Sequence, residues 1–373
     1  MNIDELPTPC ALVDRGRVDA NTAWMSRRAL ELGVALRPHV KTHKCAEAGR
    51  LQVRGHFGGV TVSTLAEARA FAESGFEDIT WAFPLSPDRA REALELGGSI
   101  ERLNLLVDHD DAVTALEHAA RTHDVRARVL LEVDCGDHRG GVDPTTDAGV
   151  ALARRLQTSD RVDFRGVLTH GGHAYAATDR AAIAPVAAEE RDVAVAFASR
   201  LRDEGIPVEE VSVGSTPTMR VVEDLSGVTE IRPGNYVFFD AFQAAIGSCG
   251  VDEIAFSVLA TVVGAYTEQG KVIVNAGALA LSKDAGPTHV DPDCGFGLVV
   301  SQDGATVHRD LRVTSLSQEH GQIRGAGATD HFRVGDRLRI LPNHSCLAAA
   351  QFDRYHVTSG TEVTETWTPT RGW

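Results

Sequence analysis

The sequence predicts an α/β protein, with an eight-stranded barrel of the TIM type followed by an antiparallel β domain. From about residue 10 to about residue 240, short apolar runs alternate with longer amphipathic stretches, which is typical of repeated strand–helix units. Beyond about residue 250, closely spaced apolar runs separated by Gly, Asp and Pro indicate an all-β domain. No GxGxxG follows the first apolar run, so a barrel is favoured over the open doubly wound sheet that the alternation also allows.

Apolar runs give the expected strands of the first domain: 10–13, 34–40, 58–63, 78–83, 103–107, 126–133, 164–169, 209–214 and 229–238. Alanine-rich segments between them have helical spacing, most clearly at 64–75, 111–123 and 184–205. The expected strands of the second domain are 255–268, 271–277, 295–301, 305–317, 336–342 and 354–367. We place the boundary near residue 248, where the pattern changes without a Pro-rich linker.

Composition excludes several classes of protein. The 373 residues are 43% hydrophobic and 24% charged, and no run of eighteen apolar residues occurs, which argues against a transmembrane or a disordered chain. The formal net charge of -15 repels nucleic acid and anionic membranes, so small molecules are the expected partners. Six dispersed cysteines without a CxxC pair, and an acidic start without an apolar signal segment, predict a cytoplasmic protein with reduced thiols.

Lysine is scarce, because only four of the 37 basic residues are lysines. Lys41 lies in the segment RPHVKTHK (37–44), at the carboxyl end of the second expected strand, where a barrel places its functional loops. The positive charges of Arg37 and Lys44 would lower the pKa of Lys41 and favour an amine that traps an aldehyde. Arginine cannot provide this chemistry. A solvated basic turn is the alternative interpretation.

Two Gly-containing turns near the end of the barrel are candidate phosphate sites, in segments 211–218 (VSVGSTPT) and 231–236 (IRPGNY). Small residues let backbone N–H groups approach a phosphate, and hydroxyl groups add donors. The residues that these turns offer are Ser215, Thr216, Gly234, Asn235 and Tyr236. Either turn alone can be an ordinary loop. Together with a reactive lysine, they indicate pyridoxal 5′-phosphate.

Metal-binding residues are expected in the β domain, at Pro342-Asn343-His344-Ser345-Cys346. In a strand, His344 and Cys346 would face the same side and reach one ion, leaving positions for water and substrate. A buried histidine beside a core cysteine is the alternative. His39 and His43 would form a metal pair only on a helix, which Pro38 disfavours. Two further His-rich turns, 169–175 (THGGHAY) and 317–321 (SQEHG), can supply an acid, a base or a ring contact.

Taken in order, RPHVKTHK, THGGHAY, GSTPT, RPGNYVFFD, ALSKDAGP, SLSQEHG and LPNHSC resemble the fold-type III pyridoxal-phosphate family of D-serine dehydratase, D-threo-3-hydroxyaspartate dehydratase and D-threonine aldolase. The resemblance covers nearly the whole chain. It implies an alanine-racemase-like barrel at 12–247, a β domain at 248–373 completed by residues 1–11, and a homodimer.

The resemblance also implies roles for individual residues. Lys41 would form the Schiff base with pyridoxal 5′-phosphate. Ring and phosphate contacts would fall on Tyr175, Ser215, Thr216, Gly234, Asn235 and Tyr236. His344 and Cys346 would hold a divalent metal. A thiolate ligand favours zinc, with Mn, Mg and Co as alternatives.

The activity that the resemblance implies is a lyase acting on D-configured β-hydroxy amino acids. Dehydration of D-serine, D-threonine or 3-hydroxyaspartate to a 2-keto acid and ammonia is favoured, because the family's dehydratases carry His-x-Cys where its aldolases tend towards His-x-Asp. Retro-aldol cleavage to glycine and an aldehyde, with a base such as His173, is the alternative. A racemase would need a second base, for which Tyr266 and Tyr355 are the candidates. A non-enzymatic cofactor carrier would need neither a β domain nor a metal pair.

Overall fold

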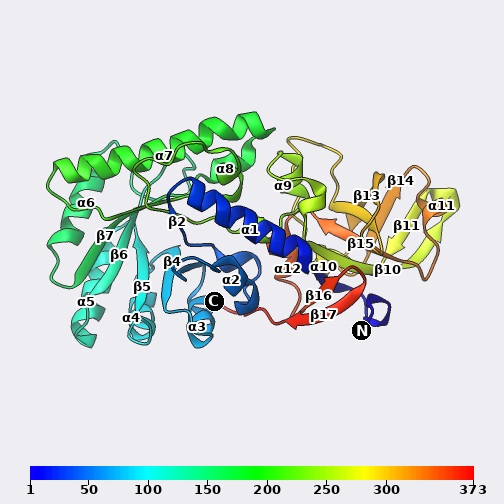
Figure 1. Ribbon diagram of the computed structural model, residues 1–373, viewed down its shortest axis with the longest axis horizontal. Coiled ribbons are helices and arrows are strands. Elements are labelled where there is room, and N and C mark those ends of the chain that lie inside the picture. Colours follow the sequence, from blue (N-terminus) through cyan, green and yellow to red (C-terminus); the bar gives the residue numbers. More distant parts are fainter. The chain divides into compact units, whose positions relative to one another are not determined.

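The computed structural model describes residues 1–373 and divides the chain into two compact units (Figure 1). The barrel unit comprises Met25–Ala177, Ala181–Gly234 and Thr370–Trp373. The β unit comprises Met1–Trp24, Thr178–Arg180 and Asn235–Pro369. These units therefore divide after Gly234, on the N-terminal side of the limit near residue 248 that the sequence suggested.

The barrel unit is built on eight strands: β2 (Ala35–Leu36), β3 (Val60–Val62), β4 (Asp78–Pro84), β5 (Arg102–Val107), β6 (Ala127–Glu132), β7 (Val162–Leu168), β8 (Glu210–Val213) and β9 (Glu230–Ile231). They lie in the order β2-β9-β8-β7-β6-β5-β4-β3, and the paired strands are parallel. A parallel bridge between His39 and Thr61 joins the segment after β2 to β3, so the sheet closes. The predicted barrel is confirmed.

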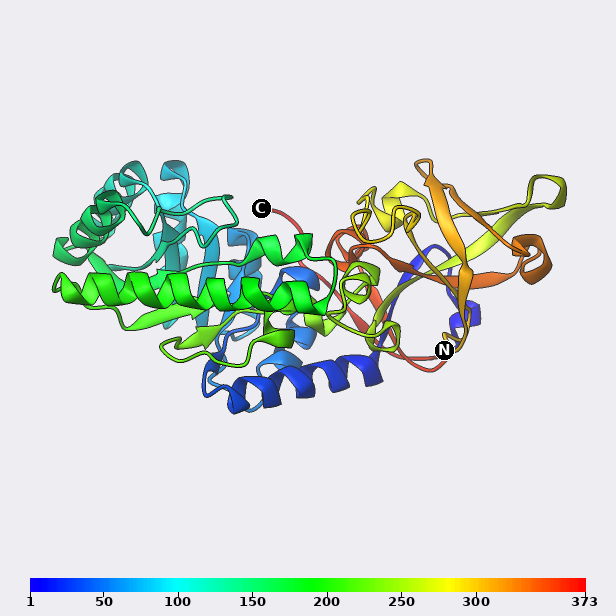
Figure 2. The ribbon, with the colours of Figure 1, turned by 90° about the horizontal axis from the view of Figure 1, so that it is seen from above.

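Helices alternate with these strands and cover the outside of the sheet, as the view from above shows (Figure 2). They are α2 (Ala46–Gln52), α3 (Leu65–Glu73), α4 (Ala90–Gly97), α5 (Asp110–His123), α6 (Asp147–Thr158), α7 (Arg180–Asp203) and α8 (Thr216–Val221), while α1 (Arg15–Glu31) links the units. In α5, Ala112, Leu116 and Ala119 form part of a buried stripe at helical spacing. The Thr64 hydroxyl caps α3 by accepting the Glu67 N–H. No helix combines the length and the apolarity needed to cross a bilayer.

Two expected strands are much shorter than predicted. The run 34–40 is a strand only at Ala35–Leu36, and the run 229–238 only at Glu230–Ile231. Each run contains a proline, Pro38 or Pro233, which has no N–H to donate to a neighbouring strand. Regular strand pairing ends before both prolines, and the His39–Thr61 bridge alone continues it beyond Pro38.

The β unit contains nine strands: β1 (Cys10–Asp14), β10 (Phe256–Tyr266), β11 (Lys271–Val274), β12 (Gly297–Ser301), β13 (Val307–Leu316), β14 (Gly321–Gly325), β15 (Arg337–Pro342), β16 (Tyr355–Ser359) and β17 (Glu362–Trp367). Six of them close a ring in the order β10-β11-β14-β13-β12-β15, with β15 pairing back onto β10. Short helices α9 (Ala241–Ala245), α10 (Ala278–Leu281), α11 (Ala328–His331) and α12 (Ser345–Ala349) connect strands. The predicted antiparallel β domain is confirmed.

One strand lies in a different sheet from the one that its apolar pattern indicated. The apolar pattern placed the run 10–13 among the barrel strands, whereas the resemblance assigned residues 1–11 to the β domain; β1 pairs antiparallel with β10 and parallel with β16 in the β unit. Strand β14 was missed because its sequence, GQIRG, has two glycines and little apolar character. An aromatic cluster of Phe238, Phe256 and Tyr355 lies fully buried in this unit, with ring centroids 5.5–6.1 Å apart.

Candidate active site

Lys41 lies in the short 3-10 helix η2 (Val40–Thr42), after strand β2 and therefore at the carboxyl edge of the barrel. His39 precedes this turn in extended backbone, and its Nδ1 accepts a hydrogen bond from the Lys41 N–H at 3.4 Å. The Lys41 side chain is half-buried. The structure thus places the predicted amine at the edge where barrel enzymes carry their functional loops.

The cations expected to act on Lys41 are paired with carboxylates. Lys44 Nζ lies 2.9 Å from Glu67 Oε1, and Arg37 Nε lies 2.8 Å from Glu230 Oε2. The sequence argument was therefore wrong about the source of the positive field, because a carboxylate in contact offsets most of each charge.

The charge of Lys41 acts on two histidines, His39 and His170. Burial, and next the charge of Lys41, holds the pKa of His39 well below its usual range. The same two causes, in the same order, lower the pKa of His170 in the loop after β7. Both imidazoles are therefore neutral at pH 7 and can donate or accept hydrogen bonds beside the amine.

Arg232 is a buried cation of the same edge. It follows β9 and donates hydrogen bonds to the Ser212 hydroxyl and the Thr169 carbonyl. Burial lowers the pKa of Arg232 to about 10, although Glu230 and Glu190 act to raise it. The guanidinium therefore remains protonated at neutral pH.

The turn after β7 carries His173 and Tyr175 in the 3-10 helix η4 (Gly172–Ala176). His173 Nε2 lies 3.4 Å from Glu189 Oε2, yet neither ring nitrogen makes a hydrogen bond although both are buried. Unbonded buried ring nitrogens are uncommon, and they leave this imidazole able to take or give a proton. Tyr175 is half-buried in the same turn.

Ser215 is committed to the start of helix α8. Its hydroxyl accepts the Thr218 N–H at 3.3 Å, and its own N–H donates to Thr218 Oγ1 at 2.9 Å. A direct phosphate contact by the Ser215 hydroxyl would compete with this cap. Thr216, the first residue of α8, takes no part in the cap and is buried.

The second expected phosphate turn is split between the two units. Gly234 ends a barrel-unit segment, and a Cβ there would come within 2.7 Å of the His39 carbonyl oxygen, so packing explains the glycine. Asn235 and Tyr236 begin the 3-10 helix η5 (Asn235–Val237) of the β unit, and both are buried. Asn235 Oδ1 is buried without a hydrogen-bond partner.

His344 and Cys346 do not lie on a strand, which corrects the expectation from their spacing. His344 is the N-cap residue of α12, and Cys346 is in the first turn of that helix. Burial lowers the pKa of His344, but the Cys346 thiolate and hydrogen bonds to Cys346 and Asp284 outweigh it and raise this pKa to about 11. The ring of His344 thus has the Asp284 carboxylate 3.1 Å from Nδ1, and Cys346 lies two residues away at the start of α12.

A polar network lies beneath this pair. The buried Asp240 carboxylate accepts from Asn235 Nδ2 at 2.8 Å and from the Ser345 N–H at 3.0 Å. Asn235 Nδ2 also lies 3.7 Å from Cys346 Sγ. The network therefore fixes the backbone between the two candidate ligands. No group of three or more His, Cys, Asp or Glu side chains is arranged to hold a metal ion.

The other candidates have structural roles. His43 is buried, with Nε2 2.8 Å from Gln52 Oε1 and Nδ1 accepting the Cys45 N–H. Both ring nitrogens are therefore engaged, so His43 does not form a metal-binding pair with His39. Tyr355 is buried and donates to the Ala349 carbonyl. Tyr266 is 48% exposed, with Lys271 over its ring.

Sequence reasoning missed several polar residues at these sites: Glu132, Arg139, Glu190, Arg232 and Asp284. Glu132 ends β6, and burial, followed by the charge of Asp108, raises its pKa to about 7. The charge of Arg139 acts on both Glu132 and His170. The Gly-rich run DCGDHRGGV after β6 was the available signal, since it resembles the other glycine turns at strand ends.

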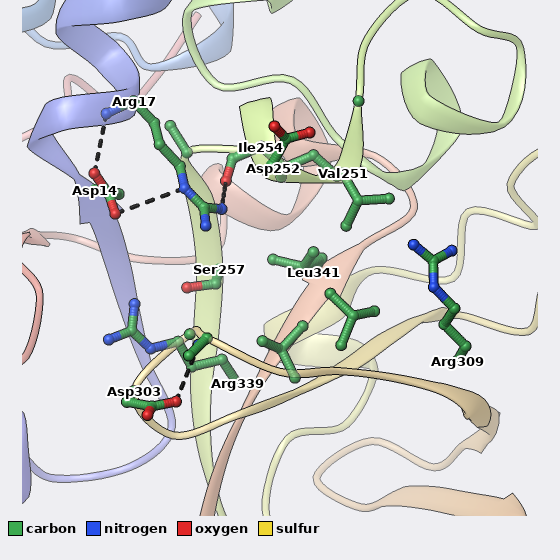
Figure 3. Close-up of a pocket in the computed structure, with 16 residues that line it drawn as sticks. Asp14, Arg17, Val251, Asp252, Ile254, Ser257, Asp303, Arg309, Arg339 and Leu341 are labelled. Atoms are coloured by element: carbon green, nitrogen blue, oxygen red, sulfur yellow. Dashed lines mark hydrogen bonds and ion pairs between the residues drawn. The ribbon is translucent and has the colours of Figure 1, made fainter.

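The β unit also has a cavity of about 480 Å³, which none of the predicted site residues lines (Figure 3). Its buried arginine, Arg339, donates to the carbonyls of Gln302 and Gly360. Arg17 binds the Ile254 carbonyl and lies 3.7 Å from Asp14. These two cations are therefore engaged in holding the fold.

Comparisons with known proteins show the family. The model of the alanine racemase N-terminal domain matches residues 13–241, and that of a putative serine dehydratase domain matches residues 255–358. D-threo-3-hydroxyaspartate dehydratase of Delftia sp. is 39% identical over 99% of this chain and 98% of that protein. The chain belongs to the alanine-racemase-like family of D-serine dehydratases. This family consists of pyridoxal-phosphate-dependent lyases, as the resemblance implied.

Other members are similar over their whole length. D-serine dehydratase of Dictyostelium discoideum is 36% identical over 100% of this chain and 98% of that protein. The solved structure of the Delftia dehydratase has a TM-score of 0.95 and 38% identity, covering 100% of both chains. D-threonine aldolase from Filomicrobium marinum is more distant, with a TM-score of 0.85 and 26% identity over 98% of this chain and 95% of that one.

Proposed function

We propose that the protein is a pyridoxal-phosphate- and divalent-metal-dependent lyase that dehydrates D-configured β-hydroxy amino acids to 2-keto acids and ammonia. The observation that carries the proposal is the pair His344–Cys346 at the start of α12, with Asp284 Oδ2 3.1 Å from His344 Nδ1. Such a pair can bind a soft divalent cation, which would stabilise a departing hydroxide group. The similarity to dehydratases of D-serine and D-threo-3-hydroxyaspartate supports the substrate class and its configuration.

The cofactor is assigned to the carboxyl edge of the barrel. The side chains there fit pyridoxal phosphate: a half-buried amine at Lys41, neutral imidazoles at His39 and His170, and a buried cation at Arg232. We expect Lys41 to bind it covalently. The ring and phosphate contacts are assigned to Tyr175, Ser215, Thr216, Gly234, Asn235 and Tyr236. When bound, the cofactor withdraws electrons from the substrate Cα.

The metal is assigned to His344 and Cys346, with zinc favoured over Mn, Mg or Co because a thiolate is a soft ligand. Asp284 accepts the hydrogen bond of Nδ1 and so would keep the ring in place while Nε2 binds the cation. Two protein ligands leave positions for water and a substrate oxygen. A metal-free structure of a Cys-to-Ala variant of the Delftia dehydratase supports a cysteine ligand in this family.

Lys41 is assigned to the chemistry at the substrate Cα, and His344 with Cys346 to the chemistry at Cβ. We assign removal of the α-proton to the Lys41 amine, which is the basic group at the cofactor edge. Hydroxide leaves Cβ poorly, since its conjugate acid, water, has a pKa of about 15.7. His344 and Cys346 would hold the metal ion, which would supply Lewis-acid stabilisation of the charge on that departing oxygen. The enamine that is released hydrolyses to the keto acid and ammonia.

Retro-aldol cleavage is the second candidate, and His173 is the observation that favours it. Both ring nitrogens of His173 are buried without a hydrogen bond, so the side chain can take the proton of a β-hydroxyl group. Removing that proton breaks the Cα–Cβ bond instead of the Cβ–O bond. A D-threonine aldolase of Arthrobacter sp. is 29% identical over 90% of this chain, which supports this alternative.

A direct test incubates the purified protein with D-serine and with L-serine, with and without a chelator. We expect pyruvate and ammonia from D-serine, loss of this activity on chelation and its recovery on adding zinc. Equal turnover of both enantiomers, or activity that a chelator leaves unchanged after full removal of metal, would contradict the proposal.

The proposal extends to the assembly and the compartment. The family resemblance supports a homodimer, which sedimentation velocity tests directly. Six free cysteines, five of them buried, support a reducing compartment such as the cytoplasm.

A further inference from the structure

A buried carboxylate joins the two loops to which we assign cofactor contacts. Glu190 lies on α7 and is 1% exposed. Its Oε1 accepts the Gly171 N–H at 2.7 Å and the Gly214 N–H at 2.9 Å, and its Oε2 accepts the Thr218 hydroxyl at 3.0 Å. Three donors from two separate loops thus converge on one side chain.

The local sequence is adapted to this approach. A Cβ at Gly171 would lie 3.0 Å from the Glu190 carboxyl carbon, which is closer than a side chain normally packs. Gly214 has a φ of +105°, a conformation that favours glycine. Both loops therefore bring bare backbone N–H groups to the carboxylate. The Thr218 hydroxyl that binds Glu190 also accepts the Ser215 N–H, so the contact extends to the start of α8.

Burying the charge of the Glu190 carboxylate costs desolvation free energy, which its hydrogen bonds must offset. Burial raises the pKa of Glu190, and the hydrogen bonds from Gly171 and Gly214 oppose this effect. Arg232 contributes an attractive positive charge without a direct contact. A carboxylate accepts several hydrogen bonds and donates none, so it matches three converging donors better than an amide or a hydroxyl does.

We propose that Glu190 is a positioning residue for pyridoxal phosphate. By tying Gly171 to Gly214, it sets the spacing between the turn that carries Tyr175 and the turn that carries Thr216. The inference rests on the proposed function, because it takes these turns as the ring and phosphate contacts. Glu190 itself touches neither reactant and acts through the two loops.

The test measures the dissociation constants of pyridoxal phosphate and of pyridoxal for the apo-protein by absorbance titration. Glu190→Ala should weaken the binding of pyridoxal phosphate at least about tenfold and that of pyridoxal much less, since two of the three lost contacts, to Gly214 and Thr218, belong to the phosphate turn. Glu190→Gln should largely restore affinity, because its oxygen still accepts both glycine N–H groups and its amide can donate to Thr218. Asp192→Asn, an exposed site on the same helix, should behave as wild type.

A purely structural staple would give a different result. If Glu190 only stabilises the fold, the Glu190→Ala apo-protein should melt at a lower temperature but bind pyridoxal phosphate within twofold of wild type. This outcome would overturn the inference. If Glu190→Ala does not fold, Thr218→Val provides the same test, because it removes the hydroxyl that binds Glu190. We expect Thr218→Val to bind pyridoxal phosphate more weakly, and unchanged binding would contradict the inference. A wild-type protein that binds no pyridoxal phosphate would instead refute the proposed function.

Discussion

His344 Nδ1 lies 3.1 Å from Asp284 Oδ2, which fixes the orientation of the candidate metal ligand. The contact with His344 holds the pKa of Asp284 below its usual range, so the carboxylate is ionised and can only accept a hydrogen bond. Nδ1 must therefore carry a proton, and Nε2 is left for Cys346 or for a metal. Carboxylates commonly orient metal-binding histidines in this way.

Removing the charge of Asp284 should weaken metal binding. Because the ring would lose its fixed tautomer, Asp284→Asn should lower zinc affinity by roughly 10–100-fold, measured by competition with a chromophoric chelator. Cys346→Ala should lose the metal altogether. Asp293→Asn, an exposed residue of the same loop, is the matched control. Equal zinc content in wild type and Cys346→Ala would remove Cys346 from the site.

Covalent binding of the cofactor should depend on Lys41 alone. Lys41→Ala should lose the visible absorption of bound pyridoxal phosphate, because no other amine lies at that position. Lys44→Ala should keep it, since Lys44 is engaged with Glu67. Reduction with borohydride followed by peptide mass spectrometry identifies the modified lysine. Modification of Lys44 in the wild type would show that the assignment is wrong.

The carboxyl group of Glu132 should make stability depend on pH. Burial raises the pKa of Glu132 from 4.5 to about 7, so its contribution to stability is complete below pH 4.5 and is lost as the pH rises through 7. Glu132→Gln, which cannot ionise, should match wild type at pH 4 and exceed its stability by roughly 1–3 kcal/mol at pH 8. Thermal melts at both pH values measure this, with the exposed Glu209→Gln as control. A constant difference between the two pH values would contradict the assignment.

The barrel could be predicted from sequence because its strands are continuous apolar runs buried on both faces, as in β5 and β6. Strand β1 has the same appearance, but its partners β10 and β16 lie hundreds of residues away along the chain. The apolar pattern of residues 10–14 does not show with which distant strand they pair. This is why the apolar pattern alone placed residues 10–13 among the barrel strands.

The candidate site was predicted in outline through motifs but not in its supporting contacts. Lys41 and the His344–Cys346 pair belong to short segments whose composition is distinctive. Glu190 and Asp284 belong to an alanine-rich helix and a surface loop, where an acidic residue is ordinary. Their importance comes from the hydrogen bonds that they receive, which only the folded chain shows.

The most direct test of the central claim is product analysis with D-threonine, because one substrate distinguishes the two reactions. Dehydration breaks the Cβ–O bond and predicts 2-oxobutyrate and ammonia in equal amounts, with both products lost in Cys346→Ala. Retro-aldol cleavage breaks the Cα–Cβ bond, and glycine with acetaldehyde as the main products would contradict the account.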